Sequence, residues 1–296
     1  MTRAALLSVI ICTHDRPGDL RRCLDAVALL EDPVEVVVVD SASEPPSREI
    51  VERFASRIGE LTYVREDEPG LSRARNRGLR TARCDLVAYL DDDAAPHPDW
   101  ARRIAAAFAA DRQVACVGGA CRAVFPDCDR PRWLSDRLLQ FAGITRFRES
   151  REARSSAEWP FGANVAFRLA ALEEAGGFPE QLGRSGTKLL SGEESAVIES
   201  LSASGWKIML EPAGVVDHVV SAERCCSAYY WRRLWWAGVG RARSPSKRRR
   251  TLARLLAAAP VRLVLYCVTW DRVYAYRLAE TAGFVSDLVL PGRMDR

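Results

Sequence analysis

Three consecutive carboxylates, Asp91-Asp92-Asp93, follow the apolar run Leu86 to Leu90. Carboxylates this close repel one another, and a hard cation such as Mg²⁺ or Mn²⁺ relieves the repulsion by accepting their oxygens as ligands. A cation held there could stabilise the negative charge on a departing diphosphate. A solvated acidic turn, in which Asp99 caps the following helix, is the simpler explanation of the triplet taken alone.

Three further sets of residues could carry chemistry, and each has an ordinary alternative. Arg75 lies in the first turns of a helical pattern that follows a Pro-Gly turn, and a guanidinium suits phosphate oxygens, although surface helices carry arginines without any ligand. Glu193 and Glu194 begin another helical pattern, where the helix dipole alone favours carboxylates. His218 follows a short apolar run, where a histidine can simply pack. None of these residues indicates a site by itself.

Apolar runs typical of strands alternate with helical patterns through the first half of the chain. Strands are expected at 7–12, 34–39, 61–64, 86–90 and 114–123, with helices opening at Arg16-Pro17 and covering 47–58, 71–82 and 99–110. This alternation predicts a mostly parallel, doubly wound α/β sheet. Ligands bind such sheets at the carboxyl ends of the strands, where this sequence places His14-Asp15, Asp40 and the aspartate triplet.

The second half is more mixed. A loop-rich section at 125–160 contains one expected helix near 133–141, and a strand is expected at 163–167. A helix at 192–204 and two short strands at 208–210 and 214–216 follow. From Arg224 onward the pattern is helical and basic.

The totals fit a large α/β domain with a helical appendage. The chain has 296 residues, of which 48% are hydrophobic and 28% charged. Its nine cysteines are scattered without a C-x-x-C motif, which indicates reduced thiols in the cytoplasm, and three histidines form no zinc cluster. The apolar run at Leu6 to Cys12 is too short for a secretory leader. No run of about 18 uncharged apolar residues is present, so no spanning helix is expected.

The net charge of +4 hides an asymmetry along the chain. Residues 224–290 contain thirteen basic and three acidic side chains, a net charge of +10, so the remainder carries −6. A basic end suggests an anionic partner or surface, and a solvated helix face explains it equally well. Apolar residues at helical spacing after Lys247 to Arg250 are compatible with a helix lying on an anionic membrane: Leu252, Leu255, Leu256, Ala259 and Leu263. Packing against the catalytic domain or a second subunit is the alternative.

Taken in order, the motifs resemble the family 2 glycosyltransferases of GT-A fold. The resemblance covers roughly residues 6–243, and no single motif carries it. Its pieces are Ser8-Val9-Ile10-Ile11-Cys12-Thr13-His14-Asp15-Arg16-Pro17, Val37-Val38-Val39-Asp40-Ser41, Gly70-Leu71-Ser72 with Ala74-Arg75-Asn76-Arg77-Gly78, Ala88-Tyr89-Leu90-Asp91-Asp92-Asp93, Phe161-Gly162-Ala163-Asn164, Gly192-Glu193-Glu194, Gly205-Trp206-Lys207-Ile208 and Val216-Asp217-His218.

The resemblance implies a role for each matching residue. Nucleotide binding would fall to Thr13, Asp15, Arg16, Asp40, Arg75, Asp91 and Asp92, with Asp40 accepting from the base and Arg75 holding the nucleotide or its phosphates. Asp91 and Asp93 would be the outer positions of the D-x-D motif and would bind Mn²⁺ or Mg²⁺, with His218 as a late ligand of the metal or diphosphate. Asn164 and Glu193 would face the donor sugar or the acceptor, and Glu194 would be the catalytic base.

The sequence departs from the family pattern at the base. The family commonly has Glu-Asp, and here the pair is Glu193-Glu194, so the base would be one methylene longer. The Q-x-x-R-W signature of processive polymerases is absent, which favours one sugar per acceptor. A single base with direct displacement implies inversion of the anomeric centre, with UDP- or dTDP-sugars favoured as donors and GDP-sugars left open.

The resemblance also implies an organisation and a location. We expect a GT-A domain over 1–223, with a nucleotide-binding half of about 1–123 and an acceptor half of about 124–223, followed by a helical, basic extension over 224–296. The enzyme would be cytoplasmic, either free, peripheral on the inner face of the membrane, or a homodimer through its C-terminal helices.

Three alternatives stay open. A sugar-nucleotide nucleotidyltransferase could share the sheet and the acidic site, although the glycine-rich phosphate loop usual after the first strand is missing. A nucleic-acid-binding protein could be led by the basic end, although the acidic strand ends argue against that partner. A glycosyltransferase that has lost catalysis is the third.

Overall fold

The computed structural model describes residues 4–184, 189–243 and 248–289, and the chain divides into two compact units. The first unit comprises the chain up to residue 124 together with 143–181 and 193–219. The second comprises 125–142, 182–192 and the chain from residue 220 onward. The functional division into a nucleotide half and an acceptor half stays a prediction.

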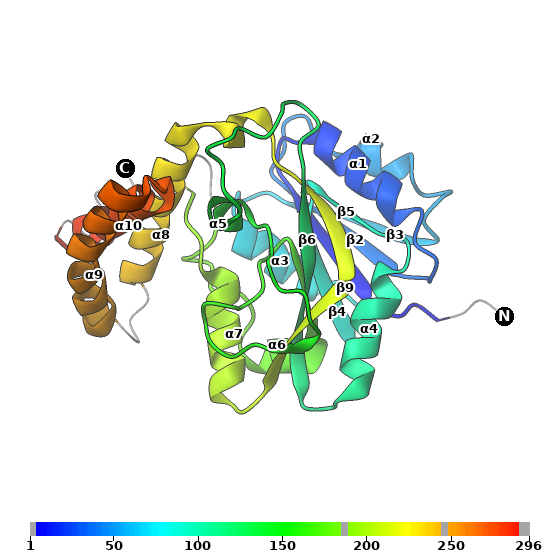
Figure 1. Ribbon diagram of the computed structural model, residues 1–296. Coiled ribbons are helices and arrows are strands. Elements are labelled where there is room, and N and C mark those ends of the chain that lie inside the picture. The colour runs from blue at the N-terminus through cyan, green and yellow to red at the C-terminus, as the bar shows by residue number, and fades with distance from the viewer. Residues whose placement is uncertain (1–3, 185–188, 244–247, 290–296) are drawn as a thin grey trace. The chain divides into compact units, whose positions relative to one another are not determined.

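A nine-stranded sheet forms the centre of the first unit (Figure 1). Six of its strands run in one direction, whereas β8, β5 and β7 run the opposite way, which confirms the predicted mostly parallel sheet. The strand order is β3 (Glu60–Glu66), β2 (Glu35–Ser41), β1 (Ser8–Thr13), β4 (Leu86–Asp91), β8 (Asn164–Arg168), β6 (Val114–Val124), β9 (Lys207–Val219) and β5 (Ala94–Pro96), and β7 (Arg151–Glu152) pairs with β9.

Helices cover both faces of this sheet. The helices α1 (Pro17–Val27), α2 (Arg48–Glu52) and α4 (Trp100–Ala110) pack on one face, and α3 (Leu71–Leu79), α6 (Leu169–Glu174) and α7 (Glu193–Ala203) on the other (Figure 1). Along β1, Val9 and Ile11 join the first apolar cluster and Ile10 joins the second, as the alternation of a strand requires. The valines at 36–39 are fully buried, which explains a run of β-branched residues with no polar face.

Several segments differ from the sequence-based expectation. The helix expected at 47–58 is shortened to α2, and the two short strands expected near 208–216 are one strand, β9. The strand stays continuous because β6 pairs with it along its length, and a shift of register opposite Gly119 and Ala120 accommodates residues 212–214, which include a proline. The short elements β5, β7 and α6 were not predicted.

The buried side chain of Asn164 ties four elements of the first unit together. Its amide oxygen accepts a hydrogen bond from the indole nitrogen of Trp100 at 2.9 Å. Its amide nitrogen donates to the carbonyl oxygens of Ala120, at 3.1 Å, and Gly214, at 2.9 Å. A Cβ atom at Gly119 would lie 2.3 Å from this nitrogen, so only glycine leaves room for the cross-link.

The second unit contains three long helices, α8 (Ser227–Arg243), α9 (Arg248–Thr269) and α10 (Arg272–Val289), together with the short helices α5 (Asp136–Leu139), η1 (Gln140–Ala142) and η2 (Ala222–Cys225). Glycines allow α8 and α10 to approach closely, since a Cβ atom at Gly238 would lie 2.0 Å from the carbonyl oxygen of Glu280. Buried carboxylates on α10 also join the two helices, through the pairs Arg241–Glu280 and Arg243–Asp287.

Within the described residues, one stretch is long and apolar enough to cross a membrane. It is Leu252–Thr269 in α9, with a mean hydropathy of 1.6 and only 6% of the stretch buried. The sequence-based expectation considered only uncharged runs and therefore passed over this stretch, which Arg254 and Arg262 interrupt. Length and composition alone carry this finding.

We predict that Asn164→Ala lowers the free energy of unfolding by about 2–4 kcal/mol, because it leaves the Trp100 N–H group and two carbonyls buried without their partner. Urea denaturation followed by circular dichroism measures the change. Ser200→Ala, at an exposed position of α7, is the control and should stay within about 0.5 kcal/mol of the wild type. Unchanged stability together with lost sugar transfer would instead return Asn164 to the substrate site.

Candidate active site

The carboxyl ends of β1, β2 and β4 meet at one edge of the sheet because the three strands are parallel neighbours. Thr13 lies opposite Asp40 in the β1–β2 pair, and Cys12 lies opposite Asp91 in the β1–β4 pair. The residues that follow these strands therefore share one region, as expected for a doubly wound sheet.

The three aspartates face different partners. Asp92 is buried and accepts hydrogen bonds from the Thr13 hydroxyl at 2.8 Å and from Arg16 at 3.2 Å. Asp93 is also buried, with one oxygen 3.3 Å from Arg16. Burial raises the pKa of Asp92 to about 7, and the charges of Asp93 and Asp91 add to the rise, whereas Arg16 and Thr13 oppose it. The side chain of Asp92 thus stabilises the loop and points toward Thr13 of β1.

Asp91, Asp93 and His218 form a cluster that suits a divalent cation. One ligand atom from each lies within 4.8 Å of the others. His218 arrives from β9, whose antiparallel pairing with β5 sets it opposite Ala94, and the Val219 amide donates to the Asp93 carbonyl at 2.9 Å.

The imidazole of His218 supports this assignment. It is 3% exposed, and neither ring nitrogen has a hydrogen-bond partner among the described residues. Its Nε2 atom lies 2.9 Å from Asp93 Oδ1, close enough for an ion pair but without the geometry of a hydrogen bond. A buried imidazole against two carboxylates is a ligand set that fits Mn²⁺ or Mg²⁺.

A buried arginine separates this cluster from the glutamate pair. Arg75, in α3, is 3% exposed and lies 3.5 Å from Asp91 and 2.7 Å from Glu193. Burial opposes its charge, but attraction to Glu193, Asp91 and Glu194 outweighs burial and raises the pKa of Arg75 above its ordinary value. A Cβ atom at Gly162 would lie 2.2 Å from the guanidinium, which explains the glycine before Asn164.

The two glutamates at the start of α7 are not equivalent. Glu193 is buried, and its Oε1 atom accepts the hydrogen bond from Arg75. Glu194 is partly exposed. Glu194 is thus the more exposed residue of the pair, although its Oε2 atom is buried.

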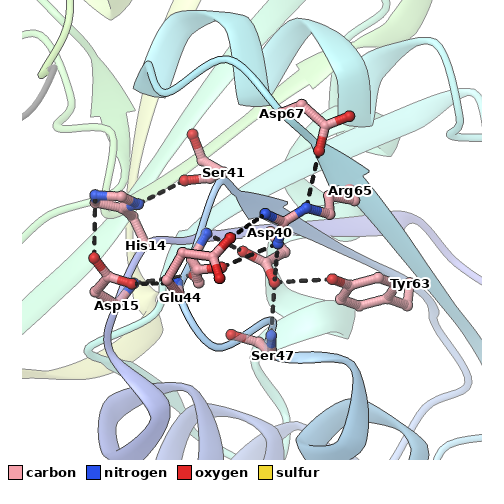
Figure 2. A network of polar contacts seen from close by, with 10 residues as sticks. His14, Asp15, Asp40, Ser41, Glu44, Ser47, Tyr63, Arg65 and Asp67 are labelled. Carbon is pink, nitrogen blue, oxygen red and sulfur yellow. Dashed lines mark hydrogen bonds and ion pairs between the residues drawn. The ribbon is translucent and has the colours of Figure 1, made fainter.

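A second polar network surrounds Asp40 and forms the other side of the strand edge (Figure 2). Asp40 is fully buried and accepts hydrogen bonds from the Ser43 and Ser47 amides, at 2.9 and 2.7 Å, and from the Tyr63 hydroxyl at 2.8 Å. Burial favours the neutral acid, but these donors outweigh it and lower the pKa of Asp40. A contact between Asp40 and a base stays a prediction, and it requires one of these donors to be displaced.

The residues around this network hold the loop after β2. Asp15, with a positive φ of 53°, accepts from the Glu44 amide at 2.8 Å, and His14 Nδ1 lies 2.6 Å from the Ser41 carbonyl oxygen. Arg65 contacts Glu44 at 3.0 Å and Asp67 at 2.9 Å (Figure 2). Asp15 is half exposed and remains able to meet a ligand.

The structure therefore places many of the predicted site residues in two networks, one around the aspartate triplet and Arg75 and one around Asp40, and Asn164 joins neither. Thr13, Arg16 and the aspartate triplet share one network, which the buried Arg75 extends to Glu193. Asn164 does not join them: its amide is 1% exposed and fully used by Trp100, Ala120 and Gly214. These contacts give Asn164 a structural task, and its proposed contact with sugar is untested.

Sequence reasoning missed Tyr63 and Arg65. Both lie on β3, and the register sets Arg65 directly opposite Asp40. Ligands bind doubly wound sheets at the carboxyl ends of the strands, and the sequence-based expectation considered the ends of the first, second and fourth strands only. The same rule applies to the third strand, so the sequence contained a signal for this region. Gly162 was noted only as part of a motif, and its clearance for Arg75 needed coordinates.

The chain belongs to glycosyl transferase family 2, whose sequence profile matches residues 8–176. It is 24% identical over 238 residues to a glucosyl-dolichyl phosphate glucuronosyltransferase of Haloferax volcanii, covering 78% of this chain and 75% of that protein. It is 34% identical over 203 residues to the validoxylamine A glucosyltransferase of Streptomyces hygroscopicus subsp. jinggangensis, covering 59% of this chain and 47% of that protein, so it spans about half of that relative.

The same fold occurs in a mannosyltransferase from Pyrobaculum calidifontis, solved with GDP-Man and Mn²⁺. The TM-score is 0.64 at 23% identity, with 97% of this chain and 88% of that chain covered. This likeness confirms the GT-A fold. The protein is thus a glycosyltransferase that uses a nucleotide sugar. These matches give no support to a nucleotidyltransferase or a nucleic-acid-binding protein.

We predict that Asp93→Asn weakens Mn²⁺ binding by at least about 10- to 100-fold, because it removes a ligand oxygen from the Asp91–Asp93–His218 cluster. Calorimetric titration of Mn²⁺ without nucleotide measures this affinity. Asp92→Asn is the matched control, since Asp92 lies outside the cluster, and it should retain binding within a few-fold. Equal affinity of the Asp93 variant and the wild type would contradict the metal site.

Proposed function

We propose that this glycosyltransferase moves one sugar from a UDP- or dTDP-sugar to an acceptor hydroxyl, with inversion and with the help of Mn²⁺ or Mg²⁺. One observation carries the proposal: a buried arginine holds Glu193 and leaves Glu194 partly exposed, beside an Asp-Asp-His cluster. The arrangement supplies charge stabilisation for a leaving diphosphate and one separate carboxylate for proton transfer.

The leaving group would be stabilised without a general acid. A divalent cation bound by Asp91, Asp93 and His218 would neutralise charge on the diphosphate. Arg75, which stays protonated at every relevant pH, would hold the nucleotide or its phosphates from a fixed position. Arg16 is partly exposed and could turn from the aspartates toward the donor.

Proton removal would fall to Glu194. As the diphosphate leaves, oxocarbenium-like charge develops on the sugar, and the acceptor oxygen attacks from the opposite face. A single carboxylate that takes the acceptor proton is sufficient for this displacement, and one displacement inverts the anomeric centre. Glu193 would act through Arg75, as a positioning residue.

The nucleotide base would lie against the network around Asp40. Its carboxylates, the buried Asp40 and the half-exposed Asp15, are acceptors for the N–H group of uracil or thymine. Tyr63 and Arg65 add an aromatic face and a cation next to them. The scattered, unbridged cysteines of the described chain are compatible with a cytoplasmic enzyme.

A thermal-shift screen of UDP, dTDP and GDP, each with and without Mn²⁺, tests the donor. A nucleotide present at about 100 times its Kd stabilises the native state by about 2.7 kcal/mol, which is a shift of several degrees in Tm. We expect UDP or dTDP with Mn²⁺ to give the largest shift. A larger shift with GDP would overturn the choice of base, and no shift with any of them would overturn the donor class.

We predict that Glu194→Gln lowers kcat by about 10²–10⁴ and leaves the nucleotide Kd within a few-fold, because it removes only the base. Glu193→Gln should instead raise the Kd of the nucleotide, since Arg75 loses the charged hydrogen-bond acceptor that fixes the position of its guanidinium. Calorimetry gives the Kd values, and steady-state transfer assays give kcat. If Glu193→Gln loses the chemical step with normal binding, the base is Glu193; if both variants remain active, the proposed mechanism is wrong.

A further inference from the structure

The helix α9 carries an unusually apolar outer face. Its side chains Leu256, Val261, Leu263, Val264 and Val268 are between 51% and 73% exposed. At 100° per residue they lie on one side of the helix, within an arc of about 160° that contains no charged residue from Leu252 to Thr269. Trp270, just beyond the helix, is 77% exposed. Exposed apolar surface of this extent marks an interaction site.

The opposite side of α9 is committed to its own unit. Leu255 is buried with Ala242 of α8 and Phe284 of α10. Arg262 donates hydrogen bonds to the Arg277 carbonyl at 3.1 Å and to the Thr281 hydroxyl at 3.2 Å, both on α10. Figure 1 shows α8, α9 and α10 lying together.

These contacts argue against a helix that crosses a bilayer. To cross a bilayer, α9 would have to separate from α10 and expose the polar groups that bind Arg262. In addition, α10 carries two buried carboxylates that are paired with arginines of α8. Charged and polar groups of this kind are costly in hydrocarbon. An interfacial helix buries one apolar face and keeps the other on protein.

The charge of α9 favours one kind of membrane surface. The helix α9 contains five arginines and no acidic residue, and three of these arginines are its first three residues. Arg254 is exposed at the edge of the apolar arc. The three acidic residues of 224–290 are paired elsewhere, Glu280 and Asp287 with arginines of α8 and Asp271 with Arg137. Basic residues beside an inserted apolar face favour anionic lipid headgroups.

We propose that the apolar face of α9 docks on an anionic membrane surface, with the helix parallel to the bilayer. A second copy of the chain would also cover an apolar face, but an interface between two copies of this helix would bring like charges together. The arginines therefore favour lipid. The docking requires neither donor nor acceptor and is independent of the proposed chemistry.

Vesicle co-sedimentation of the full chain without nucleotide tests the proposal. We expect strong binding to phosphatidylcholine vesicles containing phosphatidylglycerol, weak binding to pure phosphatidylcholine, and loss of most of the difference in high salt. The double variant Leu256→Gln/Val264→Gln should bind the anionic vesicles about tenfold or more weakly, and Arg254→Gln about fivefold more weakly. Leu29→Gln, at an equally exposed leucine of the first unit, is the control and should bind normally.

The substituted side chains are exposed, so we expect each variant to retain its fold. Circular dichroism of each variant checks this. Equal binding to neutral and anionic vesicles, or to neither, overturns the proposal. So does an equal loss of binding in the Leu29 control. Light scattering separates the remaining alternative: a dimer that the double variant dissociates, with vesicles ignored, would assign the face to a second copy.

Discussion

Compensation of buried negative charge is the constraint on which the site depends. Asp91, Asp92, Asp93 and Glu193 bring four carboxylates to the strand edge and the start of α7, whereas Arg16 and Arg75 supply two positive charges. Asp92, Asp93 and Glu193 are buried, whereas the Asp91 side chain is 33% exposed, and uncompensated buried charge costs several kcal/mol. Two routes are visible: the pKa of Asp92 is raised to about 7, so that it can take up a proton, and the Asp91–Asp93–His218 cluster can hold a divalent cation.

The same constraint explains why apparently unrelated residues belong to one structure. Arg75 can occupy a buried position only because it meets Glu193 and Asp91, and because Gly162 leaves space for its guanidinium. His218 reaches Asp93 because three residues of β5 pair with β9 directly after the aspartate triplet. Backbone pairing thus positions the metal ligands, and side-chain charge positions the glutamates. The fold separates the two tasks.

The sequence was sufficient for the features that depend on periodicity and strand ends. The alternation of apolar runs predicts the sheet and both helical layers, and parallel strands place Thr13, Asp40 and Asp91 at one edge. The sequence was insufficient where a contact between residues distant in the chain determines the structure. The continuity of β9 depends on β6, and the burial of Asn164 depends on Trp100 and Gly214, which are distant in the chain.

The glutamate pair shows the same limit at the scale of single side chains. Adjacent glutamates at a helix start have the same composition, the same dipole environment and nearly the same place in the sequence. What distinguishes them is the hydrogen bond that Glu193 accepts from the guanidinium of Arg75, contributed by a helix more than a hundred residues earlier. A substitution at Glu193 therefore alters the charge balance around Arg75 and cannot serve as a silent control for Glu194. The chemistry of each carboxylate follows from its partner, and the partner is a property of the fold.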